Sequence, residues 1–239
     1  MTPVRVLTYN VRSLRDDPAA VARVVRAIDP DVLCLQEVPR FWDWRVKRRR
    51  LARDCGMDIA AGRRACGLAI LTAPRVRRLR REFHLLSPTP GLHRRALAIA
   101  VLQVAGARLV AACTHLDLMT APRRRHATEI LTHLDRARRR YEAPVVLTGD
   151  INEEPGGPTW SLFTDRFQDA YAVAPDGEEL TFSSRNPRRR IDAVFADETV
   201  EIIAGGVPSA TAEEYPQATD HRPVQATLNL SPSLPNSQG

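Results

Sequence analysis

Hydrophobic residues recur along this chain in two alternating patterns, one typical of strands and one typical of helices. Residues 4–11 form a short apolar run that predicts a strand, and residues 31–36 form another. Between them, residues 16–28 place apolar side chains at helical spacing. That segment begins with two aspartates before Pro18, which predicts a capped amphipathic helix. The run 31–36 is apolar almost throughout, which indicates a strand buried on both faces of a sheet.

Strand-like segments dominate the middle of the chain. A basic helix over residues 39–54 precedes them, and a long helix over residues 122–141 follows them. The expected strands cover residues 57–61, 67–72, 76–86, 95–104 and 108–115. Gly106 lies between the last two, where the ability of glycine to adopt positive φ suits a hairpin turn.

The C-terminal third continues with shorter elements. We expect a buried strand at residues 144–147, a short helix near residues 159–163, and strands at 180–183, 190–196, 200–203 and 224–230. Many strands, few helices and no repeat or linker favour one layered α/β domain over residues 1–230. Residues 231–239 are rich in Ser, Pro, Asn and Gly, which predicts a disordered tail.

Composition limits the class of protein. The chain has 239 residues, of which 44% are hydrophobic, so it can bury a substantial core. A run of about eighteen apolar residues, the signature of a transmembrane helix, does not occur. The first residues lack the zones of a signal peptide, and the four cysteines show no metal-binding spacing. We therefore expect a cytoplasmic protein with reduced thiols, and a monomer.

The charge adds two competing interpretations. A net charge of +7 favours polyanionic partners, namely nucleic acid or an anionic membrane surface. However, Lys47 is the only lysine among 35 basic residues and alanine is abundant, a skew that is also typical of GC-rich coding bias. The arginine-rich runs cover residues 45–53, 75–81, 123–125 and 188–190. Clustering of these runs around one cleft would favour nucleic acid, whereas scatter would favour compositional bias.

Side chains that bind metals or phosphates occur at six points at or near the ends of strand-like runs. They are Asn10; Glu37; His115; Asp150 and Asn152 in Gly149-Asp150-Ile151-Asn152; Asp192; and Asp220 and His221 in Thr219-Asp220-His221-Arg222-Pro223. Ligands gather at strand ends in α/β sheets, so these segments could converge. Each segment taken alone also has an ordinary structural explanation, such as an Asx turn or a surface carboxylate.

Taken together and in this order, the segments resemble the endonuclease/exonuclease/phosphatase superfamily, which includes pancreatic-type deoxyribonucleases and neutral sphingomyelinases. The resemblance runs from Leu7 to Val224. It implies a DNase I-like α/β (α+β) fold, a four-layer sandwich of two packed mixed β-sheets flanked by helices. It also implies a hydrolase that acts on phosphate ester bonds and depends on Mg²⁺ or Mn²⁺.

The resemblance assigns expected roles to individual residues. Glu37 and Asn10 match metal-binding positions, and Asp220 matches a further carboxylate that binds the metal or lies beside it. Oxygen ligands of this kind suit Mg²⁺. Asp150 is expected to orient or deprotonate the attacking water, while Asn152 donates hydrogen bonds to the phosphate.

The histidines complete the expected site. His221 matches the catalytic histidine, either as a base toward water or as a proton donor, with Asp192 as its carboxylate partner. A pairing of Asp192 with an arginine of the run 188–190 is the structural alternative. His115 matches a second histidine that donates to a phosphate oxygen.

The remaining cationic side chains carry weaker signals. Arg94-Arg95-Ala96-Leu97 resembles a family strand that carries a phosphate-facing arginine, whose guanidinium can contact phosphate through two hydrogen bonds. The period-2 alternation of a strand favours Arg95 over the adjacent Arg94, and a solvated arginine at a strand edge is the alternative. The other histidines lack such a context, and we expect His126 and His133 to be exposed on the long helix.

The expected function is hydrolysis of a phosphodiester or phosphomonoester by in-line attack of water, with a nuclease as the first choice because of the positive charge. The alternative is a phosphatase or a sphingomyelinase/phospholipase C-like esterase that acts on a lipid headgroup or a small anionic phosphate. A non-catalytic polyanion-binding module is a third interpretation, and the intact set of acids and histidines argues against it.

Overall fold

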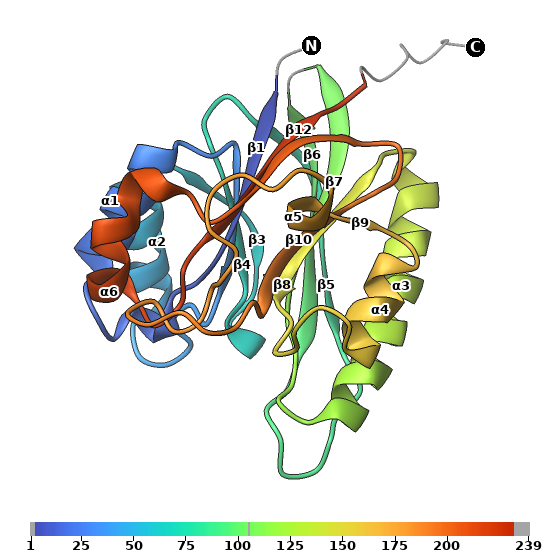
Figure 1. Cartoon of the computed structure of the whole chain (residues 1–239), viewed down its shortest axis with the longest axis horizontal. Coiled ribbons are helices and arrows are strands. Elements are labelled where there is room, and N and C mark those ends of the chain that lie inside the picture. The colour runs from blue at the N-terminus through green and yellow to red at the C-terminus, as the bar shows by residue number, and fades with distance from the viewer. Residues whose placement is uncertain (1–2, 105, 232–239) are drawn as a thin grey trace.

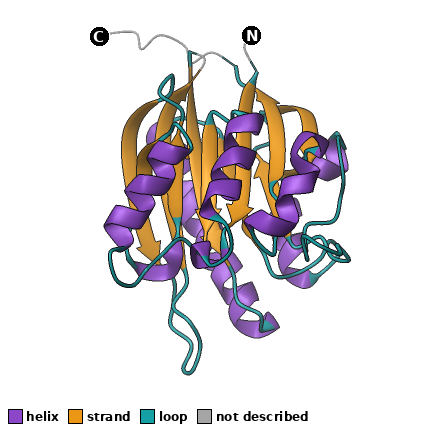
Figure 2. Ribbon diagram, turned by 90° about the vertical axis from the view of Figure 1, so that its left-hand side faces the viewer, coloured by secondary structure: helices purple, strands orange, loops and turns teal. Residues whose placement is uncertain are grey.

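Two six-stranded mixed sheets pack face to face, and helices cover the outer face of each sheet (Figure 1, Figure 2). The computed structural model describes residues 3–104 and 106–231. The layers confirm the expected α+β sandwich. The domain bounds 1–230 stay a prediction, and the expected tail lies, apart from Ser231, outside the described residues.

The first sheet has the strand order β11-β12-β1-β2-β4-β3. Its strands are β1 (Val4–Asn10), β2 (Val32–Gln36), β3 (Asp58–Gly62), β4 (Ala69–Thr72), β11 (Glu201–Gly206) and β12 (Val224–Asn229). Strands β1 and β2 run parallel, and the other neighbours are antiparallel. Helices α1 (Pro18–Ile28), α2 (Trp44–Asp54) and α6 (Tyr215–Ala218) lie on the outer side of this sheet (Figure 1).

The second sheet has the order β5-β6-β7-β8-β10-β9. Its strands are β5 (Arg77–Leu85), β6 (Ala96–Val104), β7 (Ala107–His115), β8 (Val145–Asp150), β9 (Gln168–Asp169) and β10 (Asp192–Ala196). Strands β7 and β8 run parallel. Helices α3 (Thr120–Tyr141) and α4 (Pro158–Thr164) cover its outer face (Figure 1). The short elements are α5 (Ala170–Val173), η1 (Arg12–Leu14), η2 (Ala65–Gly67) and η3 (Ser209–Glu214).

Strand β6 shows how the core is divided. Ala98 and Ala100 belong to the apolar cluster between the two sheets, whereas Leu97 and Ile99 belong to the cluster beneath α3. Successive side chains of a strand point to opposite faces, so a strand between two apolar layers must be apolar at every position. This explains the uninterrupted hydrophobic run in the sequence.

Local signals fix the start of α1 as expected. The Asp17 side chain accepts a hydrogen bond from the backbone nitrogen of Ala19 at 2.8 Å, and Pro18 occupies the first helical position. The cap satisfies one of the free N–H groups at the helix start, and proline supplies a suitable φ. The apolar face, including Val21 and Val25, is buried against the first sheet.

Three expectations for secondary structure and burial are wrong. The helix expected over residues 39–54 begins only at Trp44, because the preceding backbone has positive φ at Trp42 and Asp43. Residues 180–183 form no strand and make only isolated bridges. Neither of the two histidines expected to be exposed is so: His126 is buried under the loop between β5 and β6, where its Nε2 atom lies 2.9 Å from the backbone oxygen of Ser87, and His133 is half-buried against His84.

Candidate active site

Strand register places three of the expected site residues in one row. The parallel pairing of β7 with β8 sets His115 opposite Asp150, and the antiparallel pairing of β8 with β10 sets Asp150 opposite Asp192. Directly opposed residues share one face of a sheet and lie about 5 Å apart. All three are buried. The second sheet therefore presents an imidazole and two carboxylates side by side.

The first sheet contributes an amide and a carboxylate. Asn10 ends β1, and Glu37 follows the end of β2 with φ of 54°. The Nδ2 atom of Asn10 donates to Glu37 Oε1 at 3.3 Å and to Asp150 Oδ2 at 3.0 Å. Its Oδ1 atom accepts from the backbone nitrogen of Arg12 at 3.1 Å, which fixes the orientation of the amide. Asn10 thus links the acids of the two sheets.

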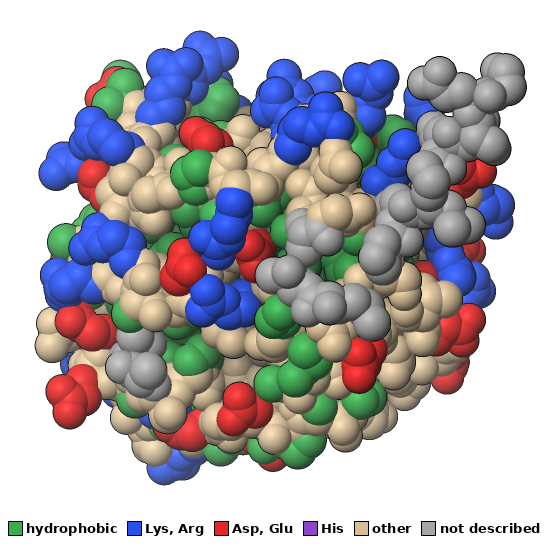
Figure 3. Space-filling view, turned by 90° about the horizontal axis from the view of Figure 1, so that it is seen from above, with side chains coloured by type: hydrophobic (Ala, Val, Ile, Leu, Met, Phe, Trp, Pro, Cys, Tyr) green, Lys and Arg blue, Asp and Glu red, His purple; other side chains and the backbone are tan. Residues whose placement is uncertain are grey.

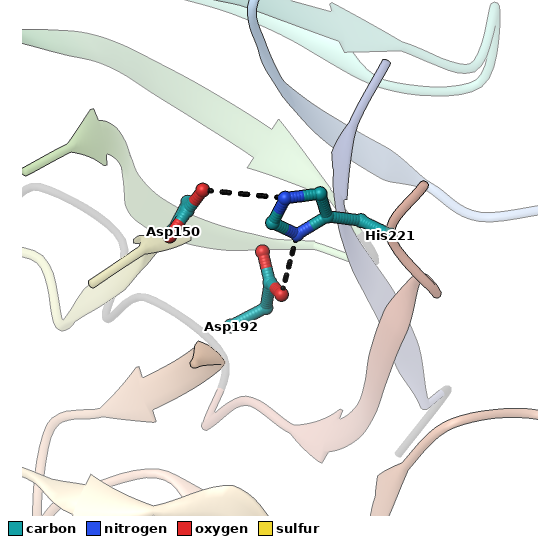
Figure 4. A group of neighbouring side chains, drawn as sticks. All are labelled: Asp150, Asp192 and His221. Carbon is teal, nitrogen blue, oxygen red and sulfur yellow. Dashed lines mark hydrogen bonds and ion pairs between the residues drawn. The ribbon is translucent and has the colours of Figure 1, made fainter. Parts of the chain in front are cut away.

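His221 completes the group from the segment before β12 (Figure 4). Its Nδ1 atom lies 2.9 Å from Asp192 Oδ2, and its Nε2 atom lies 3.7 Å from Asp150 Oδ2. Asp192 does not pair with Arg190, the alternative partner offered by the run 188–190, because Arg190 pairs with Asp169 at 2.6 Å. A carboxylate at Nδ1 fixes the ring orientation and leaves Nε2 facing the catalytic carboxylate.

The two histidines have opposite charge preferences. Burial disfavours the imidazolium of His221, but the adjacent Asp192 and Asp150 carboxylates outweigh this effect and raise the pKa of His221 to about 10. Burial lowers the pKa of His115 to about 3, although Asp150 opposes the change, and the positive charge of Arg95 contributes to the lowering. Near neutral pH, these pKa shifts favour the imidazolium form of His221 and the neutral form of His115.

These side chains meet at a cavity of about 390 Å³. Glu37, His115, Asp150, Asn152 and His221 line it, together with Arg15, Arg40, Arg94, Arg95 and His93. Asn10 and Asp192 lie outside its lining and hold the residues that face it. Asp220 is also outside the lining and pairs with Arg12 at 3.3 Å. Sequence reasoning gave no role to His93 or Arg40, whose loops reach this cavity only in the folded chain.

The acids fit a hard divalent cation. Asp150, Asp192 and His221 form a group whose ligand atoms all lie within 4.8 Å of one another. However, His221 Nδ1 is already bonded to Asp192, so we regard these two as a hydrogen-bonded pair. Glu37 Oε1 and Asp150 Oδ2 both accept from the amide nitrogen of Asn10, at 3.3 and 3.0 Å, so carboxylate oxygens of the two sheets face one point between them. Carboxylate oxygens are what Mg²⁺ and Mn²⁺ prefer.

The signature Gly149-Asp150-Ile151-Asn152 is shaped by close packing. A Cβ atom on Gly149 would lie 2.2 Å from the backbone oxygen of Thr114, so only glycine allows β7 and β8 to approach here. The backbone nitrogen of Asn152 donates to Asp150 Oδ1 at 3.0 Å. The segment is thus an Asx-type turn as well, with Oδ1 in the turn and Oδ2 facing the other site residues.

A buried ion pair that sequence reasoning missed anchors the two loops of the second sheet. Arg123 pairs with Glu153 at 2.6 Å and donates to the backbone oxygens of Asp117 and Leu118 at 3.0 and 2.9 Å. Glu153 also accepts from the backbone nitrogens at the start of α4. The pair therefore ties the loop after His115 to the loop after Asp150. The one signal in the sequence that pointed to this ion pair was Glu153, which directly follows Asp150-Ile151-Asn152.

The arginine runs do not converge on this cavity. Arg75 pairs with Asp29 and Asp31 beside a separate cavity, and Arg123 and Arg190 lie in buried ion pairs. Basic and acidic side chains are interspersed on the face shown in Figure 3. This scatter favours compositional bias for much of the surface charge. Arg94 and Arg95 both line the cavity, and Arg95 lies deeper, 3.6 Å from Asp117.

Comparisons with known proteins agree with the fold. Solved structures with the same fold include a mannosyl-6-phosphatase from Bacteroides thetaiotaomicron, which is 20% identical with a TM-score of 0.81 over 95% of this chain and 100% of that one. The human Nocturnin catalytic domain with bound sulfate is 18% identical, with a TM-score of 0.75 over 96% of this chain and 95% of that one. Truncated TDP2 from Caenorhabditis elegans is 19% identical, with a TM-score of 0.69 over 95% and 98%. No curated protein sequence gives a significant match.

The sequence itself matches a family description over most of its length. The matched segment, residues 7–221, begins in β1 before Asn10 and ends at His221, so it includes every residue of the expected site. The resemblance inferred from the six segments is thereby confirmed. This chain belongs to the Endonuclease/Exonuclease/phosphatase family.

Proposed function

We propose that this protein is a divalent-metal-dependent phosphoesterase that hydrolyses its substrate by in-line attack of water, with a nucleic acid phosphodiester as the first candidate substrate. The observation that carries the proposal is the convergence on Asp150 of Asn10, His115 and His221, at 3.0, 3.5 and 3.7 Å from its Oδ2 atom. Two histidines and an amide around one buried carboxylate make a site that can hold water and stabilise negative charge.

The charge states of the two histidines suggest a separate role for each of them and for Asp150. Asp150 orients the attacking water and accepts its proton. His221, held by Asp192 and cationic near neutral pH, donates a hydrogen bond to the phosphoryl oxygens as charge develops there. His115 is neutral and donates through its N–H to another phosphate oxygen.

Substrate phosphate is held by further donors at the cavity. Asn152 lines the cavity, although its Nδ2 atom bonds the backbone oxygen of Leu116 at 3.0 Å. Its role as a phosphate donor therefore requires a second hydrogen on the same amide nitrogen, which an amide has. Arg95 is half-buried at the cavity wall and supplies a guanidinium to the phosphate.

Glu37 would hold the metal, with Asn10 and Asp220 as the further ligands expected from the sequence. A bound Mg²⁺ or Mn²⁺ supplies Lewis-acid polarisation of the phosphoryl group and stabilises the leaving oxygen. Asn10 now presents its amide nitrogen to both carboxylates, so direct ligation through its oxygen requires the amide to rotate.

A second candidate substrate is a lipid headgroup or a small phosphate ester. Because the arginine runs are scattered, the positive charge gives less support to a nucleic acid substrate. A cavity of about 390 Å³ suits a compact phosphorylated group. None of the described helices is long and apolar enough to cross a membrane. A monomeric state and a cytoplasmic location stay predictions.

The deciding experiment is a substrate panel. Plasmid nicking, hydrolysis of phospholipids and release of phosphate from phosphorylated sugars are measured with Mg²⁺ or Mn²⁺, and again with a chelator. We expect the parent to cleave at least one class of substrate. Chelator should abolish this turnover, and so should the variants Glu37→Gln and His221→Ala. Full turnover by both variants on every substrate that the parent cleaves would overturn the proposed mechanism.

A further inference from the structure

An exposed aromatic pair lies beside the cavity. Phe41 and Trp42 are 64% and 89% exposed, directly after Arg40, which lines the cavity wall. Val46, in the first turn of α2, is 62% exposed. Large apolar side chains that gather on a soluble surface mark interaction sites, whereas single ones need no explanation. We call Phe41, Trp42 and Val46 the apolar tip.

A second apolar group flanks the same cavity from the other sheet. Leu118 and Met119, in the loop after β7, are 75% and 57% exposed. Leu118 and Arg40 both line the cavity, so the apolar tip and this loop stand at its rim. Two exposed apolar segments from different sheets thus border one catalytic cavity.

The surface next to the apolar tip is basic and lacks ionic partners. Arg45, Lys47 and Arg49 of α2 are exposed, and none has a carboxylate within ion-pair distance among the described residues. Arg50 and Arg53, farther along the helix, do pair with Asp54. Arg45 and Arg49, four residues apart, share one side of α2, whereas Lys47 lines a separate cavity with Asp17 and Asp54. Arg45 and Arg49 are thus the cations without an ionic partner that can meet an anionic partner together with the apolar tip.

The apolar tip is held in place by a buried cation. Arg48 is buried beneath α2, where it donates to the backbone oxygens of Pro39 and Arg63 at 3.0 and 2.8 Å and lies 4.9 Å from the Trp44 ring. These bonds fix the loop that carries Phe41 and Trp42. The aromatic side chains are therefore presented to solvent by an anchored segment, which reduces the conformational entropy lost on binding.

We infer that the apolar tip and the two cations Arg45 and Arg49 of α2 form a docking surface for an anionic lipid bilayer, with the catalytic cavity beside it. Aromatic and aliphatic side chains enter the boundary between headgroups and acyl chains, while Arg and Lys contact anionic headgroups. Nucleic acid is the other polyanion that aromatic and basic groups bind, by base stacking. Val46, Leu118 and Met119 offer no ring for stacking, so the composition favours lipid.

This inference goes beyond the proposed function, because it concerns where the protein binds and holds for any phosphate ester that it cleaves. The test is co-sedimentation of the full chain with vesicles of phosphatidylcholine alone or with about 30% phosphatidylglycerol, without metal. We expect at least tenfold tighter binding to the anionic vesicles, weakened by salt. Equal binding to both vesicle types, or none, overturns the inference.

Two variants and two matched controls locate the surface. Phe41→Ser/Trp42→Ser and Arg45→Gln/Arg49→Gln should each weaken anionic-vesicle binding at least tenfold. The controls Val173→Ser/Ile203→Ser and Arg124→Gln/Arg136→Gln remove the same number of exposed apolar or basic side chains elsewhere. They should stay within twofold of the parent. Equal losses in a control and its matched variant would show nonspecific adsorption and refute the surface.

Binding of a single-stranded oligonucleotide is measured with the same proteins. If the aromatic variant loses oligonucleotide binding but keeps vesicle binding, the surface recognises nucleic acid and the lipid assignment is wrong. Vesicle binding needs no turnover. Its failure is therefore distinguishable from failure of the proposed hydrolysis, which the substrate panel measures separately.

Discussion

The Nδ1 atom of His221 lies 2.9 Å from Oδ2 of Asp192, although the two residues are 29 positions apart in the chain. The bond joins the segment before β12 of the first sheet to β10 of the second. It orients the other ring nitrogen toward Asp150, so the imidazole, which comes from the first sheet, makes both of these contacts with the second sheet. The site therefore exists only when the two sheets are packed together.

The first prediction concerns this bond. Asp192→Asn keeps the size of the side chain but removes the charge that orients His221 and favours its imidazolium. We expect kcat to fall by about 100- to 10,000-fold, the usual contribution of an acid or base, with His221→Ala at least as impaired. Steady-state kinetics on the best substrate of the panel measure the loss, and circular dichroism checks the fold.

His133→Ala is the matched control for the histidine change. His133 stacks on His84 at 4.0 Å between ring centroids, and it is not among the residues that line the catalytic cavity. Its activity should match the parent. An Asp192→Asn variant with unchanged kcat would show that the pairing has no part in the reaction.

The second prediction concerns metal binding without turnover. If Glu37 holds the cation, Mn²⁺ stabilises the folded state, by about 2.7 kcal/mol at 100 times the dissociation constant. Glu37→Gln should raise the Mn²⁺ concentration needed for a given rise in Tm at least about tenfold. Thermal unfolding at several Mn²⁺ concentrations measures both proteins.

Glu198→Gln controls for the loss of one negative charge. Glu198 is exposed in the turn after β10, which begins at the site and runs away from it. Its response to Mn²⁺ should equal that of the parent. If Glu37→Gln also responds like the parent, Glu37 is not a ligand.

The third prediction tests the close approach at Gly149. Gly149→Ala places a methyl group against the Thr114 backbone oxygen, so β7 and β8 must separate beside His115 and Asp150. We expect a loss of about 1–3 kcal/mol in unfolding free energy by urea titration. We also expect activity to fall about 100-fold in the folded protein, because catalytic groups tolerate little displacement.

Gly156→Ala separates this effect from the general cost of replacing glycine. Gly156 has φ of 84°, and nothing lies within 4 Å of an added Cβ. Its replacement should destabilise by about 1 kcal/mol and leave activity intact. Equal loss of activity in the two variants would contradict the steric explanation.

The fourth prediction concerns the buried pair of Arg123 and Glu153. Burial raises the pKa of Glu153, but hydrogen bonds from Arg123 and from the backbone at the start of α4 outweigh this and lower it below its ordinary value of 4.5. A lowered pKa in the folded state means that the ionised pair stabilises the protein above about pH 4.5. The stabilisation is lost as the pH falls through the folded pKa.

Glu153→Gln should therefore destabilise the protein near neutral pH by about 3–5 kcal/mol, because Arg123 stays buried without its partner. It should also flatten the dependence of stability on pH below about 4.5. Arg123→Met/Glu153→Gln, which removes both charges, should be less destabilised than the single variant. Urea unfolding between pH 3.5 and 7 measures the parent, Glu153→Gln, Arg123→Met and the double variant. A double variant as unstable as the sum of the two single variants would argue against coupling.

Much of the fold could be predicted because its signals are local. Asp17 and Pro18 mark the start of α1, and the apolar run of β6 reports burial on both faces. The helix after Glu37 was placed too early, because the positive φ values at Trp42 and Asp43 arise in a loop held by Arg48 from outside it. Propensity alone cannot show such distant contacts.

The residues of the candidate site could likewise be predicted only where their signals are local. Each polar residue at or near a strand end could be named from the sequence, since strand periodicity shows where a strand stops. Arg123 and His126 could not be placed, because both belong to a helix rich in charged residues and become buried only where loops from elsewhere close over them.

The sequence by itself determined the elements, their order and the chemical groups at their ends, because these depend on neighbouring residues. Only the tertiary structure decided which groups meet and in which charge state. His115 and His221 have the same side chain, yet their pKa values move in opposite directions. Desolvation and the charges of nearby groups set those values, and both depend on distances through space that exist only after the two sheets have packed.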